Sequence, residues 1–95
     1  MIERHVTFNV VPEKTTEFEQ FFMHEYRPAM SSMAGFVKVA LLRNQDQPSQ
    51  YCMVISFDST QNASAWRASA EHQALKPELS SLYHDSSLKV YEVVT

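Results

Sequence analysis

Glycine and cysteine occur only once each in this chain of 95 amino acids. Nucleotide-binding loops need several glycines so that the backbone can approach phosphates closely. The single Gly35 therefore excludes both the dinucleotide-binding fingerprint and the phosphate-binding loop. The single Cys52 cannot form an internal disulfide. It stands in the apolar run Tyr-Cys-Met-Val-Ile, with no neighbouring His or Lys, which favours a packing thiol over a reactive one.

Clusters of positive charge and long apolar runs are missing as well. Eight Lys and Arg stand against 11 Asp and Glu, and no segment gathers the basic residues that nucleic-acid binding requires. No apolar run approaches the roughly 20 residues that cross a bilayer. The charged, alternating start MIERHVTFNV differs from a signal peptide. We therefore expect one cytoplasmic domain over residues 1–95, without contact to nucleic acid or membrane.

Four segments carry the patterns of β-strands. Residues 2–11 alternate between apolar and polar side chains until Pro12, which typically ends a strand. Residues 36–43 and 50–58 are apolar at both parities, which indicates strands that are covered on both faces. Residues 87–94 form the last predicted strand. In a chain this small, helices can cover one face of the sheet, and we expect a second subunit to cover the other.

Residues 14–31 are predicted to form the first helix. Thr16 followed by Glu19 has the spacing of a capping box, with Thr15 or an earlier residue as an alternative start. Pro28 is expected to loosen the last turn, because proline disfavours helical geometry in the residue before it. One broad face of this helix carries Phe18, Phe21, Phe22, Glu25, Tyr26 and Ala29.

The second helix is predicted over residues 59–76. Ser59 caps it, and Asn62 falls at its third position. Pro77 is expected to break the helix, and residues 78–83 can add another turn or two. The resulting order, β-α-β-β-α-β, is the ferredoxin-like α+β pattern with a four-stranded antiparallel sheet and helices on one face. The face toward the sheet combines three alanines with the only tryptophan: Ala63, Trp66, Ala70 and Ala74.

Hydrogen bonding and acid–base chemistry in an apolar pocket are what the remaining side chains offer. No two histidines lie three or four residues apart, and none has a cysteine beside it, so a metal site is not predicted. No serine flanked by glycines marks a nucleophile elbow. The four histidines are His5, His24, His72 and His84.

Each candidate residue is open to a structural and a functional interpretation. Trp66 either fills the gap between helix and sheet or walls a pocket with its N–H free for a substrate oxygen. His72 either ends a helix or takes a phenolic proton. Asn62 either bonds first-turn backbone groups or donates to a substrate carbonyl, and Glu25 either reaches solvent or rims a pocket. Trp66 and His72 stand about 240° apart on a helix, so they converge only if it bends, as Pro77 suggests.

Four short motifs follow one another along the chain. The first strand ends in Val-Pro-Glu-Lys, Gly35-Phe36 opens the second strand, and Ser-Phe-Asp-Ser ends the third at residues 56–59. The second helix then carries Trp-Arg-Ala-Ser-Ala-Glu-His at residues 66–72. With these motifs the chain resembles the antibiotic biosynthesis monooxygenase family along nearly its whole length.

The resemblance implies a dimeric α+β barrel, in which two protomers pack their sheets face to face and each keeps a pocket between sheet and helices. In monooxygenase members the substrate is a phenolic polycycle or quinol, oxidised by O₂ through a substrate anion without flavin, haem or metal. One type of member carries an Asn, a Trp four residues later and an aromatic hydroxyl six beyond the Trp. Asn62 and Trp66 keep the first spacing, whereas His72 stands in the third position.

A haem-degrading branch shares this fold, and the resemblance to it is weaker. That branch has an Asn in the first strand, the Trp, and a His ten residues after the Trp. Here Trp66 is kept, but Lys76 stands at the ten-residue position, and Thr7 stands in the first strand with Asn9 two residues along. We therefore do not expect haem degradation.

The combined prediction is a homodimer through the sheet that acts on a small aromatic or quinone-like ligand without cofactor or metal. His72 is the predicted base, and Trp66 and Asn62 are predicted to orient the substrate. The alternative is a non-catalytic domain that binds or senses a small apolar ligand in the same pocket. The further residues predicted to bind the substrate are Phe22, Glu25, Tyr26, Val54 and Tyr83.

Overall fold

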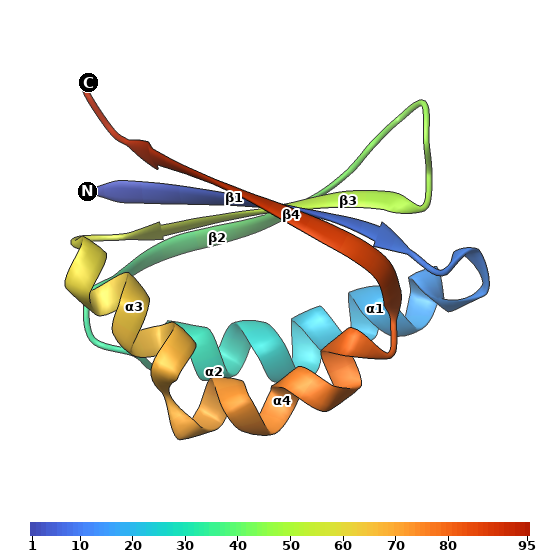
Figure 1. Ribbon diagram of the computed structural model, residues 1–95, viewed down its shortest axis with the longest axis horizontal. Coiled ribbons are helices and arrows are strands. Elements are labelled where there is room, and N and C mark those ends of the chain that lie inside the picture. Colours follow the sequence, from blue (N-terminus) through green and yellow to red (C-terminus); the bar gives the residue numbers. More distant parts are fainter.

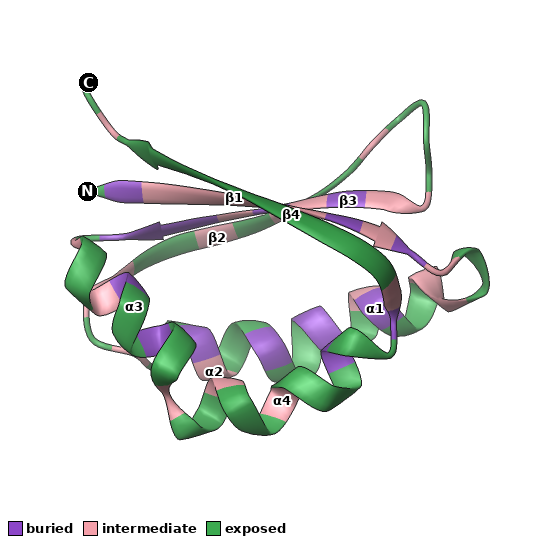
Figure 2. Ribbon diagram, viewed as in Figure 1, coloured by how far each residue is buried: buried purple, intermediate pink, exposed green.

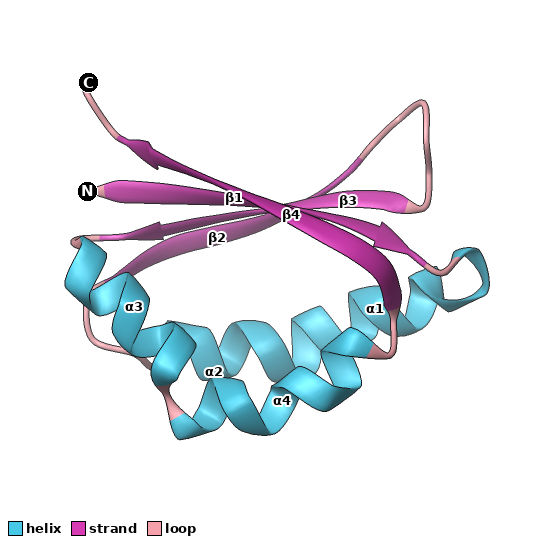
Figure 3. Cartoon of the chain, in the orientation of Figure 1, coloured by secondary structure: helices cyan, strands magenta, loops and turns pink.

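The computed structural model describes residues 1–95 as one antiparallel sheet with helices on one side (Figures 1 and 3). The strand order in the sheet is β2-β3-β1-β4. This arrangement confirms the predicted ferredoxin-like α+β fold. The strands are β1 (Ile2–Val10), β2 (Phe36–Arg43), β3 (Gln50–Phe57) and β4 (Tyr83–Glu92). The helical segments are η1 (Pro12–Lys14), α1 (Thr15–Phe21), η2 (Phe22–Tyr26), α2 (Arg27–Ser31), α3 (Thr60–Ala68) and α4 (Ala70–Ser80).

The two faces of the sheet differ in what covers them. Phe8 and Val10 on β1, with Met53 and Ile55 on β3, are buried beneath the helices. The core lies in this layer, whereas the opposite face has no helix over it (Figures 1 and 2). Period-two alternation places the other residues of each strand on that open face, which retains large exposed apolar side chains such as Leu42.

The first helical layer runs without interruption from η1 to α2, but its middle is a π-helical turn. The N–H of Arg27 donates to the carbonyl of Phe22, five residues earlier. Pro28 follows directly and has no N–H to give, so the irregularity predicted for this end of the helix is confirmed. The predicted capping box is wrong: Lys14 is the N-cap of α1 and makes no side-chain cap bond. The Glu19 carboxylate instead accepts from Tyr51 and Arg43.

The second helical layer bends at Ser69, eight residues before the predicted break at Pro77. Ser69 has an extended backbone, with φ −67° and ψ 152°. Its Oγ donates to the carbonyl of Trp66 at 2.7 Å and accepts from the N–H of His72 at 3.1 Å. One hydroxyl thus ends α3 and starts α4, because serine satisfies orphan groups at helix termini well. Pro77 lies inside α4.

The last strand begins at Tyr83, four residues earlier than predicted. It pairs with β1 along its whole length, from Val10 opposite Tyr83 to Ile2 opposite Glu92. The irregularity in register falls between Asn9 and Val10. The early part of β4 is polar and exposed, so it has no apolar alternation that would reveal a strand. None of the helices combines the length and apolar character needed to span a membrane.

Gly35 occupies the one backbone position with positive φ, at 80°. Its carbonyl accepts from the N–H of Asp58 at 2.8 Å, which fixes the start of β2 against the end of β3. A Cβ at this position would lie 2.4 Å from both Asn62 Nδ2 and Asp58 Oδ1. The conformation and the crowding both require glycine here.

Gly35→Ala should therefore lower the free energy of unfolding by roughly 2 kcal/mol or more, since left-handed strain and a steric clash add up. Urea unfolding followed by circular dichroism measures this loss. Ala34→Ser, at the exposed neighbouring position, is the matched control and should stay within about 0.5 kcal/mol of the parent. An unchanged unfolding midpoint for Gly35→Ala would contradict the assignment.

Candidate active site

A cavity of about 240 Å³ lies between the sheet and the second helical layer. Its walls come from β1, β3, β4, η2, α3 and α4, so every layer of the fold contributes. Nine of its 15 lining residues are hydrophobic: Val6, Phe8, Tyr26, Met53, Ile55, Trp66, Leu79, Tyr83 and Leu88. The remaining six are Arg4, Arg67, His72, Lys76, Ser86 and Ser87. Largely apolar walls with a few polar groups are typical of small-molecule sites.

Three aromatic rings meet edge to face at the centre of this cavity. The rings of Trp66 and His72 lie 5.0 Å apart between centroids, at 80°. Tyr26 lies 5.5 Å from Trp66 and 5.9 Å from His72, again with steep interplanar angles. Trp66 and His72 thus meet in one cavity, which the sequence left dependent on a bend in the helix. The cause is the bend at Ser69, which turns the first residues of α4 back toward the last turn of α3.

The surroundings of His72 disfavour its charged form. Burial lowers the pKa of His72, and the positive charges of Arg67, Lys76 and Arg4 lower it further. Its Nδ1 is buried and has no hydrogen-bond partner. A buried nitrogen without a hydrogen-bond partner is uncommon, because it has lost its hydrogen bonds to water and has gained none from the protein. The imidazole lines the cavity, so it is placed to accept a proton from a molecule bound there.

Tyr26 is suited to donating a hydrogen bond and not to acting as a base. Burial raises the pKa of Tyr26 to about 12, so the phenol keeps its proton throughout the neutral range. The side chain is only 5% exposed. Trp66, equally buried, carries an indole N–H that can only donate. The three rings thus comprise two fixed donors and one titratable acceptor.

Four of the eight predicted site residues line the cavity: Tyr26, Trp66, His72 and Tyr83. Asn62 does not. Its Nδ2 donates to Asp58 Oδ1 at 2.8 Å, and its backbone N–H donates to Ser59 Oγ at 3.2 Å. Asn62 is therefore the third helical residue that the spacing predicted, and it packs against Gly35. Its predicted place beside the substrate is not what the structure shows.

The other three predicted residues also lie elsewhere. Val54 belongs to the open face of the sheet, where it pairs with His5 and Ala40, because its neighbours Met53 and Ile55 take the inward parity. Glu25 is exposed, since the wide π-helical turn rotates it away from the face it would share in a regular helix. Phe22 is buried in the core and lines a separate hollow near Arg43.

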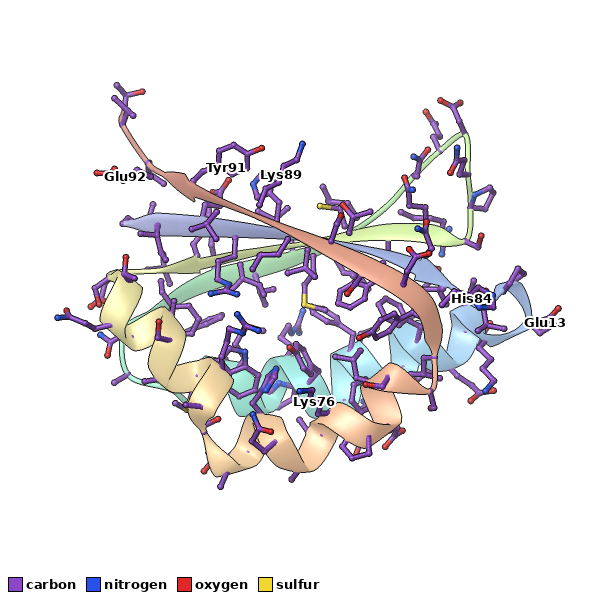
Figure 4. All side chains as sticks on the ribbon, in the orientation of Figure 1. Glu13, Lys76, His84, Lys89, Tyr91 and Glu92 are labelled. Carbon is purple, nitrogen blue, oxygen red and sulfur yellow. The ribbon has the colours of Figure 1, made fainter.

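Three cations at this cavity were missed. Arg4 is half-buried on β1, and Arg67 follows Trp66 on α3. Lys76 lies on α4 (Figure 4). Signals for two of them existed in the sequence. Arg4 shares its parity with Val6 and therefore its face of the sheet, and Lys76 is one turn beyond His72. No group of three or more His, Cys, Asp or Glu side chains is placed to hold a metal ion.

The fold and the cavity define a small ferredoxin-like α+β domain with an aromatic site between sheet and helices. The family model for antibiotic biosynthesis monooxygenase matches residues 1–78, and the chain belongs to this family. The resemblance seen in the sequence motifs is thereby confirmed. No curated protein matches the chain.

Solved structures share the whole fold. A proposed antibiotic biosynthesis monooxygenase from Bordetella bronchiseptica superposes with a TM-score of 0.89 at 22% identity, covering 99% of this chain and 97% of that chain. Another from Caulobacter crescentus gives 0.89 at 17% identity, covering 99% and 90%. A variant of SnoaB, a cofactor-independent oxygenase from Streptomyces nogalater, gives 0.86 at 20% identity, covering 99% and 93%. At these identities the likeness shows a monooxygenase-like fold.

NMR titration of the histidine ring protons should find the pKa of His72 below the ordinary value for histidine. Arg67→Gln should raise the pKa of His72, because one of the positive charges that disfavour the imidazolium is removed. Arg27→Gln is the control, since Arg27 is an exposed residue that lines a different hollow. A His72 pKa that does not move in Arg67→Gln would refute the electrostatic coupling.

Proposed function

We propose that this protein is a cofactor-independent monooxygenase that oxidises a quinol or related phenol with O₂. The observation that carries the proposal is the neutral His72, with a partnerless Nδ1, placed edge to face with Trp66 and Tyr26 in a largely apolar cavity. Membership of the antibiotic biosynthesis monooxygenase family supports it. SnoaB, a structural neighbour, is a cofactor-independent oxygenase.

The chemistry begins with a proton transfer. His72 accepts a phenolic proton, and the resulting anion is the electron-rich species that reacts with O₂. Tyr26 and the Trp66 N–H donate hydrogen bonds to substrate oxygens and hold the ring against the cavity wall. For a quinol, one oxygen atom enters the ring to give a hydroxyquinone, and the other leaves as water. The cavity volume of about 240 Å³ falls just under the usual range for small-molecule sites and favours one or two fused rings.

Metal-free protein should therefore take up O₂ with a naphthoquinol substrate. His72→Gln should lower kcat/KM by about a hundredfold, in the usual range for loss of a general base. The rate should fall as the pH drops through the lowered pKa of His72, because the imidazolium cannot accept the proton. An oxygen electrode and product analysis measure both effects.

His24→Gln is the matched control, because His24 is exposed and bonds to Gln20 on its own helix. No O₂ uptake across a panel of quinols would refute the proposal, as would undiminished turnover in His72→Gln. A ligand that binds and is recovered unchanged would instead identify a non-catalytic binding domain.

We further infer that two copies of the chain associate through the open face of the sheet, and that the protein resides in the cytoplasm. Leu42 and Tyr91 on this face are 51% and 46% exposed. Val54 lies between His5 and Ala40 on the same face. Exposed apolar side chains of this kind, among polar ones such as Lys38 and Lys89 on the same face, are typical of an interface with a second subunit. The lone Cys52 suits a reducing compartment.

Light scattering after gel filtration should give the mass of two chains. Val54→Lys should shift the protein toward monomers, because it places an ammonium group in the buried centre of the interface. Thr60→Lys adds the same charge at an exposed position on α3 and should leave the dimer intact. A parent protein that is monomeric at micromolar concentration would exclude this assembly.

A further inference from the structure

The distribution of charge around the cavity is the feature that the proposed reaction does not use. The chain carries a net charge of −3, with 11 acidic and eight basic residues. Three of those eight, Arg4, Arg67 and Lys76, line this one cavity, and no Asp or Glu lines it. They come from β1, α3 and α4, so the fold gathers charges that the sequence keeps far apart.

None of the three cations is paired. The only ion pairs in the structure join His5 to Glu3 and Arg43 to Glu19. None of the side-chain hydrogen bonds in the structure involves the side chain of Arg4, Arg67 or Lys76 either. Arg4 is in addition half-buried, and burial and the charge of Arg67 both lower the pKa of Arg4. Like charges brought together without a counter-charge destabilise the fold, which is a cost that binding an anion removes.

The three cations lie where the apolar cavity meets a more polar region. A second, more polar hollow adjoins it and shares four of its residues: Arg4, Arg67, His72 and Lys76. Inward of these four lie the apolar walls of Trp66 and Tyr26. Outward, this hollow is lined with one hydrophobic residue among seven. The site is therefore amphiphilic, with a ring-sized apolar end and a cationic end.

We propose that the substrate is an aromatic acid, in which a carboxylate separate from the reacting hydroxyl binds to Arg4, Arg67 and Lys76. The planar guanidinium groups match a carboxylate with paired N–H donors, and the ammonium of Lys76 adds a mobile charge. The rings of the substrate then lie against Trp66 and Tyr26, and its hydroxyl lies within reach of His72. This assignment rests on the proposed function for the reaction but concerns recognition alone.

Binding of two isosteric probes tests it without turnover. By isothermal titration calorimetry at pH 7.5, 2-naphthoate should bind at least tenfold more tightly than the uncharged 2-naphthamide. Arg67→Gln and Lys76→Gln should each weaken naphthoate binding about tenfold and leave naphthamide binding within twofold. Added salt should weaken only the naphthoate complex. Arg27→Gln removes the same charge outside the cavity and should change neither affinity.

A second readout distinguishes a bound carboxylate from mere occupancy. Naphthoate should raise the pKa of His72 in NMR titrations, since an anion beside Arg4, Arg67 and Lys76 offsets their charge. Naphthamide should not raise it, because it only buries the ring further. Circular dichroism of each variant confirms that it is folded.

Equal affinities for the two probes, parallel losses of both in the variants, or no binding of either would each overturn the inference. These outcomes are separable from failure of the proposed reaction. Oxidation of uncharged quinols with no preference for acids would keep the reaction and remove this assignment. Selective naphthoate binding without any O₂ uptake would do the reverse.

Discussion

The hydroxyl of Ser69 is the contact on which the site depends. In a continuous helix, Trp66 and His72 would face in different directions, since six residues turn the chain through about 240°. Ser69 bonds to the carbonyl of Trp66 and to the N–H of His72. It therefore ends one helix and begins the next at an angle that sets the two rings 5.0 Å apart. The opposing wall of the cavity also departs from regular α-helical geometry, since Tyr26 belongs to the π-helical turn before Pro28.

Electrostatics then determine what these rings can do. Burial lowers the pKa of His72, and the same cations that are free to attract an anion lower it further. An imidazolium at this position would add a fourth positive charge and would have no proton-accepting nitrogen. When no anion is bound, the positive charges of Arg4, Arg67 and Lys76 thus favour the neutral form of His72. A bound anion raises the pKa of His72 and makes it a stronger base. In the proposed complex, anion binding and the basicity of His72 are thus coupled through Arg4, Arg67 and Lys76.

The sequence predicted the fold, and four of its eight candidate site residues line the cavity. Period-two alternation and the two-sided apolar strands predicted the sheet, because burial requires those patterns wherever the chain lies. Trp66, His72, Tyr26 and Tyr83 are the four that line the cavity, because their side chains suit an apolar environment. Asn62 was misplaced because its amide satisfies Asp58 beside Gly35, a local contact that depends on a turn geometry.

The remaining errors have equally local causes. Glu25 lies in a turn that is wider than an α-helical one, and nothing in the composition marks that turn except Pro28. Phe22 is buried in the core and lines the hollow near Arg43. To place Val54, one must know which alternate residues of β3 point toward the helices. A strand that is apolar on both faces gives no sign of this. The three cations come from separate elements, so their proximity is a property of the tertiary fold. The shared parity of Arg4 with Val6 and the one-turn spacing between His72 and Lys76 were the signals for it in the sequence.

The position of β4 has a consequence for how this scaffold can diversify. β4 is an edge strand that pairs with β1 alone, and the family match ends at residue 78, before it begins. Yet Tyr83, Ser86, Ser87 and Leu88 all line the cavity. Substitutions in this strand can reshape one wall of the cavity while the helix bend, the three rings and the three cations stay in place. One wall of the cavity and the cluster of three rings thus lie on separate parts of a 95-residue chain, so the shape of that wall can change while the rings are retained.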